Sequence, residues 1–170
     1  MKNNKVIYAV SVLIVLAALI FVSYEADSKK QVDISVSSES VLSVVNNNFN
    51  FEVLEMKDGK VKHDFEVQNN GSESVVIKKV YTSCACTTAS ILNADGDSYG
   101  LFGMQGHKGF ALNTNIEVKP GESAKVTAIY DPAAHGPKGI GKIKRIIYLD
   151  TNSTVEEQVQ IAFEATVVNN

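Results

Sequence analysis

The stretch VKHDFEVQNNG, residues 61–71, alternates apolar and polar side chains up to a turn-forming NNG. Successive side chains of a β-strand point to opposite faces, so a period of two predicts a strand with one buried face. The predicted buried face takes in Val61, His63, Phe65 and Val67. The stretch therefore predicts a half-buried strand that ends in a turn.

The same pattern recurs on both sides of this strand. Phe49, Phe51 and Val53 alternate with polar residues before it, and the Asp58-Gly59 pair between the two segments favours a hairpin. Apolar or alternating segments follow at 75–81, 124–130, 143–149 and 155–167, separated by turn signals. No stretch outside the N-terminus has a sustained helical period. The sequence predicts an all-β fold, an immunoglobulin-like antiparallel β-sandwich of about seven strands.

The N-terminal segment has a different character. Residues 6–24 are uncharged and apolar, a run of 24 − 6 + 1 = 19 residues, and a helix needs about 20 to cross a bilayer core. Lysines precede the run and acidic residues follow it, a bias that places the N-terminus in the cytoplasm. Residues 1–24 are predicted to be a signal anchor, a single transmembrane helix. Cleavage as a signal peptide is the alternative, and it would give a secreted domain.

The anchor leaves the rest of the chain outside the cytoplasm, in the periplasm or cell envelope. Residues 25–48 are rich in Ser, Asn and charged residues, so we predict a polar spacer there. Residues 49–170 are predicted to form the immunoglobulin-like domain, with a glycine-rich insertion at about 91–113.

Five short segments resemble one bacterial family. They are F-x-F at Phe49 and Phe51, HDFEVQNNG at 63–71, SCACT at 83–87, VKPGES at 118–123 and DTN at 150–152. In order they are similar to the signature of a family of extracytoplasmic Ig-like domains of unknown function, whose central motif is S-C-G-C-T. That family is similar in turn to PapD-like and Hydin-type Ig modules. Ala85 stands where the family has glycine. The resemblance implies a fold and an extracytoplasmic address, but no established activity.

The insertion at 91–113 carries glycines at a spacing of three and is unusually apolar for a loop. Loops longer than about 12–15 residues are uncommon unless they are functional or disordered. One reading is a self-packed surface loop. The other is a partner-binding loop that presents Tyr99, Phe102 and Phe110.

Cys84 and Cys86 are the only cysteines of the chain. In an extended strand they would share one face about 6.6 Å apart, whereas a disulfide needs Cβ atoms about 3.8 Å apart. Strand geometry therefore disfavours a disulfide and leaves either two packed thiols or a bridging metal, for which soft Cu(I) is the natural candidate. The predicted ligands are Cys84, Cys86, Met104 and His107, with His63 and His135 as further available histidines. Packed thiols, a local bridge and a redox relay remain open alternatives.

Other motifs carry no comparable signal. The GPKGIGK stretch at 136–142 is followed by Ile143 where a phosphate-binding loop needs Ser or Thr. An acidic stretch beginning at Asn93 lacks the glycine and glutamate of a calcium loop. The basic cluster at 138–145 is too small to indicate nucleic-acid binding. No catalytic triad or carboxylate pair stands out, so we predict no enzyme and no cofactor other than Cu(I).

These observations favour a membrane-anchored, extracytoplasmic Ig-like module for protein interaction or envelope scaffolding. Its partners would be the membrane, through the N-terminal helix, and a protein of the cell envelope. The alternative is a thiol site at the Cys-x-Cys pair, working in Cu(I) binding or as a redox relay. Folds of this kind serve mainly as scaffolds, so the function must be argued from a site.

Overall fold

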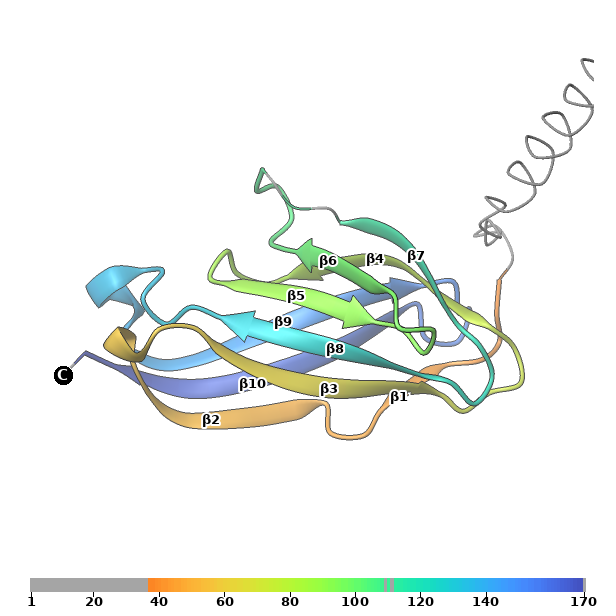
Figure 1. The fold of residues 1–170 in the computed structure, drawn as a ribbon, viewed down its shortest axis with the longest axis horizontal. Helices are drawn as coiled ribbons and strands as arrows, with labels where there is room; N and C mark the ends of the chain where they lie inside the picture. Colours follow the sequence, from red (N-terminus) through yellow and green to blue (C-terminus); the bar gives the residue numbers. More distant parts are fainter. Residues whose placement is uncertain (1–36, 109, 111, 170) are drawn as a thin grey trace, which may run out of the picture. The chain divides into compact units, whose positions relative to one another are not determined.

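Ten β-strands build two five-stranded sheets in the described part of the chain (Figure 1). The structure is a computed structural model that describes residues 37–108, 110 and 112–169. The predicted anchor at 1–24 lies outside these residues, as does the first half of the predicted spacer, residues 25–36. No helix within the described ranges is long and apolar enough to cross a membrane. The anchor therefore stays a prediction.

The first sheet has the strand order β1-β3-β8-β5-β6. Its strands are β1 (Leu42–Val44), β3 (Val61–Asn69), β8 (Ser123–Tyr130), β5 (Thr87–Leu92) and β6 (Ser98–Phe102). The second sheet has the order β2-β10-β9-β4-β7. Its strands are β2 (Asn48–Glu55), β10 (Gln158–Val168), β9 (Gly141–Thr151), β4 (Val75–Thr82) and β7 (Asn113–Val118). Two short 3-10 turns, η1 (Met56–Asp58) and η2 (Gly136–Gly139), complete the elements.

The predicted all-β sandwich is confirmed, and the predicted number of strands is too low. β1 lies inside the segment assigned to the spacer, so the sandwich begins before residue 49. β6 lies inside the glycine-rich insertion and β7 begins at its end. All three are edge strands. Short or polar edge strands show little alternation, which is why the sequence pattern missed them.

The hairpin predicted at Asp58-Gly59 is wrong. β2 and β3 belong to different sheets, and η1 with Gly59 (φ 81°) carries the chain from one sheet to the other. β2 instead pairs with β10, and this pair is parallel, unlike every other strand pair of the two sheets. A dipeptide that favours a tight turn fixes the reversal of the chain but not the sheet that receives the next strand.

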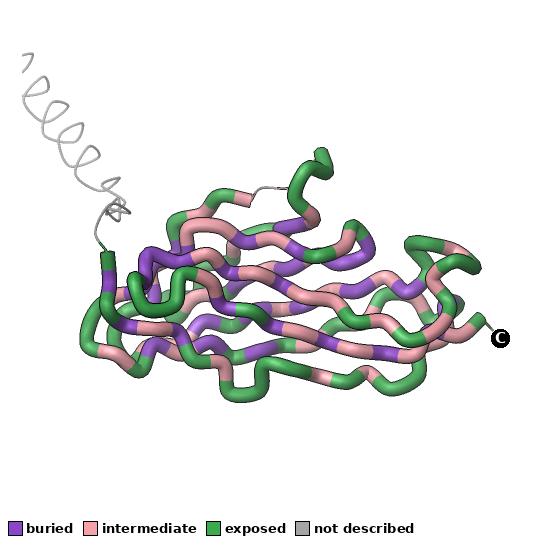
Figure 2. Tube along the Cα trace, turned by 180° about the vertical axis from the view of Figure 1, so that it is seen from behind, coloured by how far each residue is buried: buried purple, intermediate pink, exposed green. Residues whose placement is uncertain are grey.

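The core lies between the sheets, where alternate residues of β5, β8 and β10 are buried (Figure 2). Phe65 and Val67 of β3 are 3% and 0% exposed, which confirms the face predicted from the alternation. In β10 the buried set is Val159, Ile161, Phe163, Ala165 and Val167. A core this continuous holds the two sheets together without any cross-link between them.

His63 stands at the rim of this core, among aromatic rings. Its ring stacks on Phe49, with centroids 3.5 Å apart and planes 10° apart. The rings of Phe51 and Phe65 meet it edge-on, with centroids 6.2 and 4.7 Å from that of His63. Burial lowers the pKa of His63 below its ordinary 6.5, and the nearby Asp64 carboxylate opposes this only in part. Folding therefore favours the neutral form of His63.

This histidine predicts a pH dependence of stability. Because its pKa is lower in the folded state, the unfolded chain binds more protons below about pH 6.5, and stability falls as the pH falls. We expect the melting temperature to drop between about pH 7.5 and about pH 5.5, and His63→Phe to flatten this slope. The exposed His107 supplies the control, since His107→Gln should retain the wild-type slope. Equal slopes in His63→Phe and wild type would contradict the assignment.

Candidate functional site

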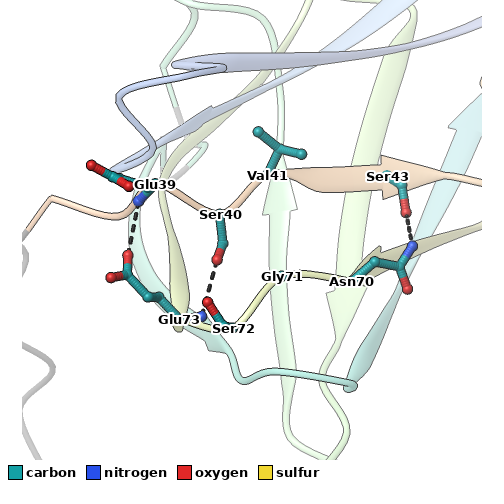
Figure 3. A pocket seen from close by; sticks show the side chains of 8 residues that line it. All are labelled: Glu39, Ser40, Val41, Ser43, Asn70, Gly71, Ser72 and Glu73. Carbon is teal, nitrogen blue, oxygen red and sulfur yellow. Dashed lines mark hydrogen bonds between the residues drawn. The ribbon is translucent and has the colours of Figure 1, made fainter.

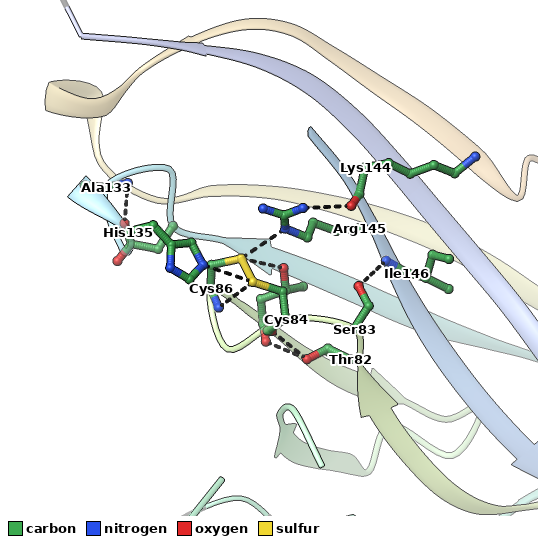
Figure 4. Close-up of a disulfide and its surroundings, with 11 residues drawn as sticks. Thr82, Ser83, Cys84, Cys86, Ala133, His135, Lys144, Arg145 and Ile146 are labelled. Atoms are coloured by element: carbon green, nitrogen blue, oxygen red, sulfur yellow. Dashed lines mark hydrogen bonds between the residues drawn. A yellow bond between two sulfur atoms is a disulfide. The ribbon is translucent and has the colours of Figure 1, made fainter. Parts of the chain in front are cut away.

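The cysteine segment is a crossover between the two sheets. β4 ends at Thr82 in one sheet and β5 begins at Thr87 in the other, so residues 83–86 must turn the chain (Figure 4). The Thr87 amide donates to the carbonyl of Cys84 at 3.1 Å. The Thr82 hydroxyl lies 2.9 Å from that carbonyl oxygen and 3.0 Å from the carbonyl oxygen of Thr87. These contacts fix a tight turn in place of an extended strand.

The turn brings the two cysteines together, and Cys84 and Cys86 form a disulfide. Their Cα atoms are 5.3 Å apart, closer than the roughly 6.6 Å between alternate residues of a strand. The expectation that strand geometry would disfavour this bridge is wrong, because the pair does not lie in a strand. Cys86 is 4% exposed and Cys84 is only half-buried, so the two sulfur atoms differ in access.

Two basic side chains flank the disulfide, one at each sulfur (Figure 4). His135 Nε2 lies 3.1 Å from Cys84 Sγ, and the His135 side chain is exposed. Arg145 Nε donates to Cys86 Sγ at 3.1 Å from a partly buried position on β9. The outer sulfur thus faces an imidazole, and the inner sulfur faces a permanent positive charge.

Arg145 is held in place from two sides. Its Nη1 donates to the carbonyl of Lys144 at 2.9 Å, and its guanidinium carbon lies 6.0 Å from the centre of the Tyr130 ring. Burial raises the pKa of Tyr130, and the charge of Arg145 opposes this in part. The tyrosine therefore stays neutral and offers an aromatic face to the guanidinium.

His135 reaches the site on the loop that follows β8. The Asp131 side chain accepts from the Ala133 amide at 3.0 Å, and the Gly136 amide donates to the carbonyl of Ala133 at 2.9 Å. The Asp131 amide donates to the carbonyl of Cys86 at 2.9 Å. This last bond ties the histidine loop directly to the cysteine turn.

The structure assembles only part of the predicted metal set. The ligand atoms of Cys84, Cys86 and His135 all lie within 4.8 Å of one another. Among the described residues, this is the group of three or more His, Cys, Asp or Glu side chains that lie close enough together to hold a metal ion. The predicted ligand His107 does not belong to it. Met104 reaches the end of β4 through a backbone bridge to Thr82. His63 belongs to the aromatic cluster described above.

The glycine-rich insertion is not one free loop. β6 pairs with β5 across the Asn93–Asp97 turn, and Phe102 is 2% exposed within the core. Tyr99 is half-buried, and the half-buried Phe110 ring covers Gly103 so closely that a Cβ there would overlap it. The predicted binding residues Tyr99, Phe102 and Phe110 therefore do not form an exposed aromatic patch.

A polar groove of about 390 Å³ lies between β1 and the β3–β4 turn (Figure 3). Its polar groups mostly bond to one another. The Glu39 amide donates to Glu73 Oε2 at 2.8 Å, the Glu73 amide to Ser40 Oγ at 3.0 Å, and Asn70 Nδ2 to Ser43 Oγ at 2.7 Å. These bonds fasten β1 to the turn, so the groove is explained by the fold.

Comparison with known families matches one part of the domain. Residues 42–95 match the family model described as "Protein of unknown function (DUF1573)". The matched segment begins with β1 and ends just after β5, so it contains the whole Cys84–Cys86 crossover. No curated protein matches the chain in sequence.

Two of the solved structures that are similar to this chain have TM-scores above 0.5 and share its fold. A protein of unknown function from Porphyromonas gingivalis W83 has a TM-score of 0.54 and 16% identity over 82% of this chain and 51% of its own. A family 123 glycoside hydrolase from Clostridium perfringens has a TM-score of 0.53 and 11% identity over 78% of this chain and 28% of its own. The ASH/PapD-like domain 7 of human CEP192 has a TM-score of 0.46 and 11% identity over 85% of this chain and 97% of its own.

The chain spans about half of the Porphyromonas protein and less than a third of the hydrolase. At these identities the likeness concerns the fold alone. A function for this domain has to be argued from its own side chains.

Proposed function

We propose that this domain is an extracytoplasmic module that exchanges disulfides with a protein partner through Cys84 and Cys86. The observation that carries the proposal is the asymmetry of the pair. The half-buried Cys84 sulfur lies beside an exposed imidazole, while the buried Cys86 sulfur accepts a hydrogen bond from Arg145. One sulfur is placed for attack and the other for departure.

The exchange can be written step by step. A thiolate of a partner dithiol attacks Cys84 Sγ, the bond to Cys86 breaks, and Cys86 leaves as a thiolate beside the Arg145 guanidinium. The second partner thiolate then attacks the mixed disulfide and releases Cys84 as a thiolate. His135 can protonate this thiolate across the 3.1 Å contact. The domain disulfide and the partner dithiol become the domain dithiol and the partner disulfide.

A purely structural bridge fits the position less well. The two cysteines are separated by a single residue, and a loop this short restricts the unfolded chain little. The chain-entropy relation gives about 1.6 kcal/mol for such a loop, against about 3 kcal/mol for a loop of 15 residues. The core between the sheets already supplies the cohesion that a bridge of this kind would add.

The proposed address rests on the apolar run at 6–24 and on redox chemistry. Disulfides persist in oxidising compartments outside the cytoplasm, where an anchor at 1–24 would hold the domain near the membrane. The proposed partner is a protein of the cell envelope with an accessible thiol pair or disulfide, so the module acts by protein interaction. We propose a stoichiometric relay and not an enzyme.

The proposal is tested by redox titration of the full-length protein in mild detergent. After equilibration in dithiothreitol buffers and alkylation, two thiols should appear together in a single two-electron transition while the domain remains folded. Cys86→Ser leaves the accessible sulfur and should form a mixed disulfide with oxidised glutathione, releasing one reduced glutathione, about tenfold faster than Cys84→Ser. A bridge that resists excess dithiothreitol until the domain unfolds would contradict the proposal, as would equal rates for the two variants.

A further inference from the structure

Three side chains with metal-binding atoms meet at the cysteine turn. The sulfur atoms of Cys84 and Cys86 come from the β4–β5 crossover, and the His135 imidazole comes from the β8–β9 connection. Their ligand atoms all lie within 4.8 Å of one another. The histidine already directs Nε2 at the cysteine pair (Figure 4).

We infer that the reduced form of this site binds one Cu(I) ion through Cys84 Sγ, Cys86 Sγ and His135 Nε2. The inference rests on the proposed function, because the disulfide must open before its sulfur atoms can bind a metal. It also changes the ligand set that the sequence suggested, since His135 takes the place assigned to His107 and Met104.

The geometry suits a three-coordinate ion. A metal about 2.3 Å from each of three ligands in a plane holds them about 4 Å apart, within the spacing that the structure has. The two sulfur atoms have to separate to about this distance on reduction. Cα atoms 5.3 Å apart allow this by rotation of the side chains alone.

The donor set selects a soft monovalent ion. Two thiolates and an imidazole are ligands that Cu(I) favours, whereas a structural Zn(II) site takes four protein ligands. Within the described ranges the cluster contains no fourth Cys, His, Asp or Glu. Two thiolates and Cu(I) carry one net negative charge, and the Arg145 guanidinium at Cys86 offsets it.

The surroundings also position the histidine. The Asp131 amide holds the carbonyl of Cys86 at 2.9 Å, and the Asp131 carboxylate caps the loop that carries His135. Such supporting contacts fix the orientation of a metal ligand. The third ligand is therefore built into the fold and does not have to be recruited from a flexible segment.

Binding and release follow the redox state of the pair. A partner dithiol reduces the disulfide and is itself oxidised to a disulfide. The two domain thiols then bind Cu(I) and release two protons. A partner disulfide reverses the sequence by oxidising the two thiolates, and the copper leaves as Cu(I). The domain would accept copper when reduced and release it when oxidised.

The test uses full-length protein, reduced and desalted without oxygen, and titrated with Cu(I) alone against a competing Cu(I) chelator. Wild type should retain one ion per chain, and X-ray absorption should give two sulfur neighbours and one nitrogen neighbour. Cys84→Ser/Cys86→Ser should lose the ion, and His135→Ala should bind at least about tenfold more weakly. His107→Ala should bind as wild type does.

Thiol counting before the metal is added separates two kinds of failure. If no thiols appear in the folded protein, the proposed exchange function is wrong. If two thiols appear and no Cu(I) is retained, only the copper inference is wrong. Equal weakening in His135→Ala and His107→Ala, or retention of Zn(II) in preference to Cu(I), would also overturn it.

Discussion

Asn69→Ala is expected to lower the free energy of unfolding by about 3 kcal/mol. The Asn69 side chain is fully buried at the end of β3. Its Nδ2 donates to the carbonyls of Glu73 and Val118 at 2.7 and 2.8 Å, and its Oδ1 accepts from the Gly71 amide at 2.9 Å. Val118 belongs to β7 of the opposite sheet, so this one side chain joins the two sheets and the β3–β4 turn.

The size of the effect follows from what alanine leaves behind. Three backbone groups lose their partner, and each buried hydrogen bond contributes about 1 kcal/mol, with a further penalty where the group stays unsatisfied. Urea unfolding of wild type and variant measures the difference, and an unchanged dependence on denaturant would show that both unfold from the same folded state.

The adjacent asparagine provides a matched control. Asn70 is exposed and donates only to Ser43 Oγ at 2.7 Å, at the surface of the polar groove. Asn70→Ala should therefore change the free energy of unfolding by about 0.5 kcal/mol or less. Similar losses in the two variants would mean that Asn69 acts as an ordinary turn residue, as its place in an NNG sequence suggests.

The strands that could be predicted from the sequence are those in which apolar and polar residues alternate along the chain. β3 and β10 are the clearest cases, since the alternate residues Phe65 and Val67, and Ile161 and Phe163, are buried as the period of two requires. Strand faces can be read locally because each side chain points opposite to its neighbour.

Where the backbone departs from a regular strand, the same reading fails. In β2, Glu52 has a positive φ of 62°. Asn50 pairs with Glu164 of β10 and Val53 pairs with Thr166, so β2 has one more residue than β10 between these two pairs. This bulge shifts the alternation, so Val53 is 64% exposed although it continues the pattern of Phe49 and Phe51. Nothing in the composition of the segment marks the extra residue.

At the site, too, the residues adjacent in the sequence could be predicted, and those brought together by the fold could not. The C-x-C spacing identified the pair of cysteines. The distance predicted between them assumed an extended strand, whereas the chain turns at this point. His135 and Arg145 reach the sulfur atoms from 51 and 59 residues away in the sequence. Arg145 belongs to the basic cluster at 138–145, which gave no functional signal in the sequence, and only the pairing of β9 beside β4 places it at Cys86.

Arg145→Met is the second change for which we expect a large effect, on redox chemistry instead of folding. The Arg145 guanidinium donates to Cys86 Sγ at 3.1 Å, and Cys86 is almost fully buried. A hydrogen bond from a charged donor contributes about 1.5–3 kcal/mol, and here it favours the thiolate that forms on reduction. Removing it destabilises the reduced state relative to the disulfide.

The expected result is a reduction potential about 30–60 mV more negative, because 30 mV corresponds to about 1.4 kcal/mol for a two-electron couple. Equilibration with dithiothreitol buffers, followed by alkylation and mass analysis, measures the potential of each variant. Urea unfolding of the oxidised proteins should accompany it, since Arg145 also packs near the Tyr130 ring. The shift in potential is converted to a free energy and compared with the change in the free energy of unfolding of the oxidised protein. If the first is larger, the excess is caused by loss of the hydrogen bond to Cys86 Sγ.

The neighbouring lysine separates this contact from general surface charge. Lys144 precedes Arg145 on β9 and is exposed. Its Nζ lies 3.3 Å from a carboxylate oxygen of Glu164 on β10. Lys144→Met removes the same charge beside the site but no donor to sulfur, so solvent screening should hold its effect to a few millivolts. Arg145→Lys keeps the charge and loses the fixed guanidinium geometry, so its potential should fall between those of wild type and Arg145→Met. If Lys144→Met and Arg145→Met shift the potential equally, Arg145 acts through net charge alone, and the buried sulfur has no specific partner in the exchange.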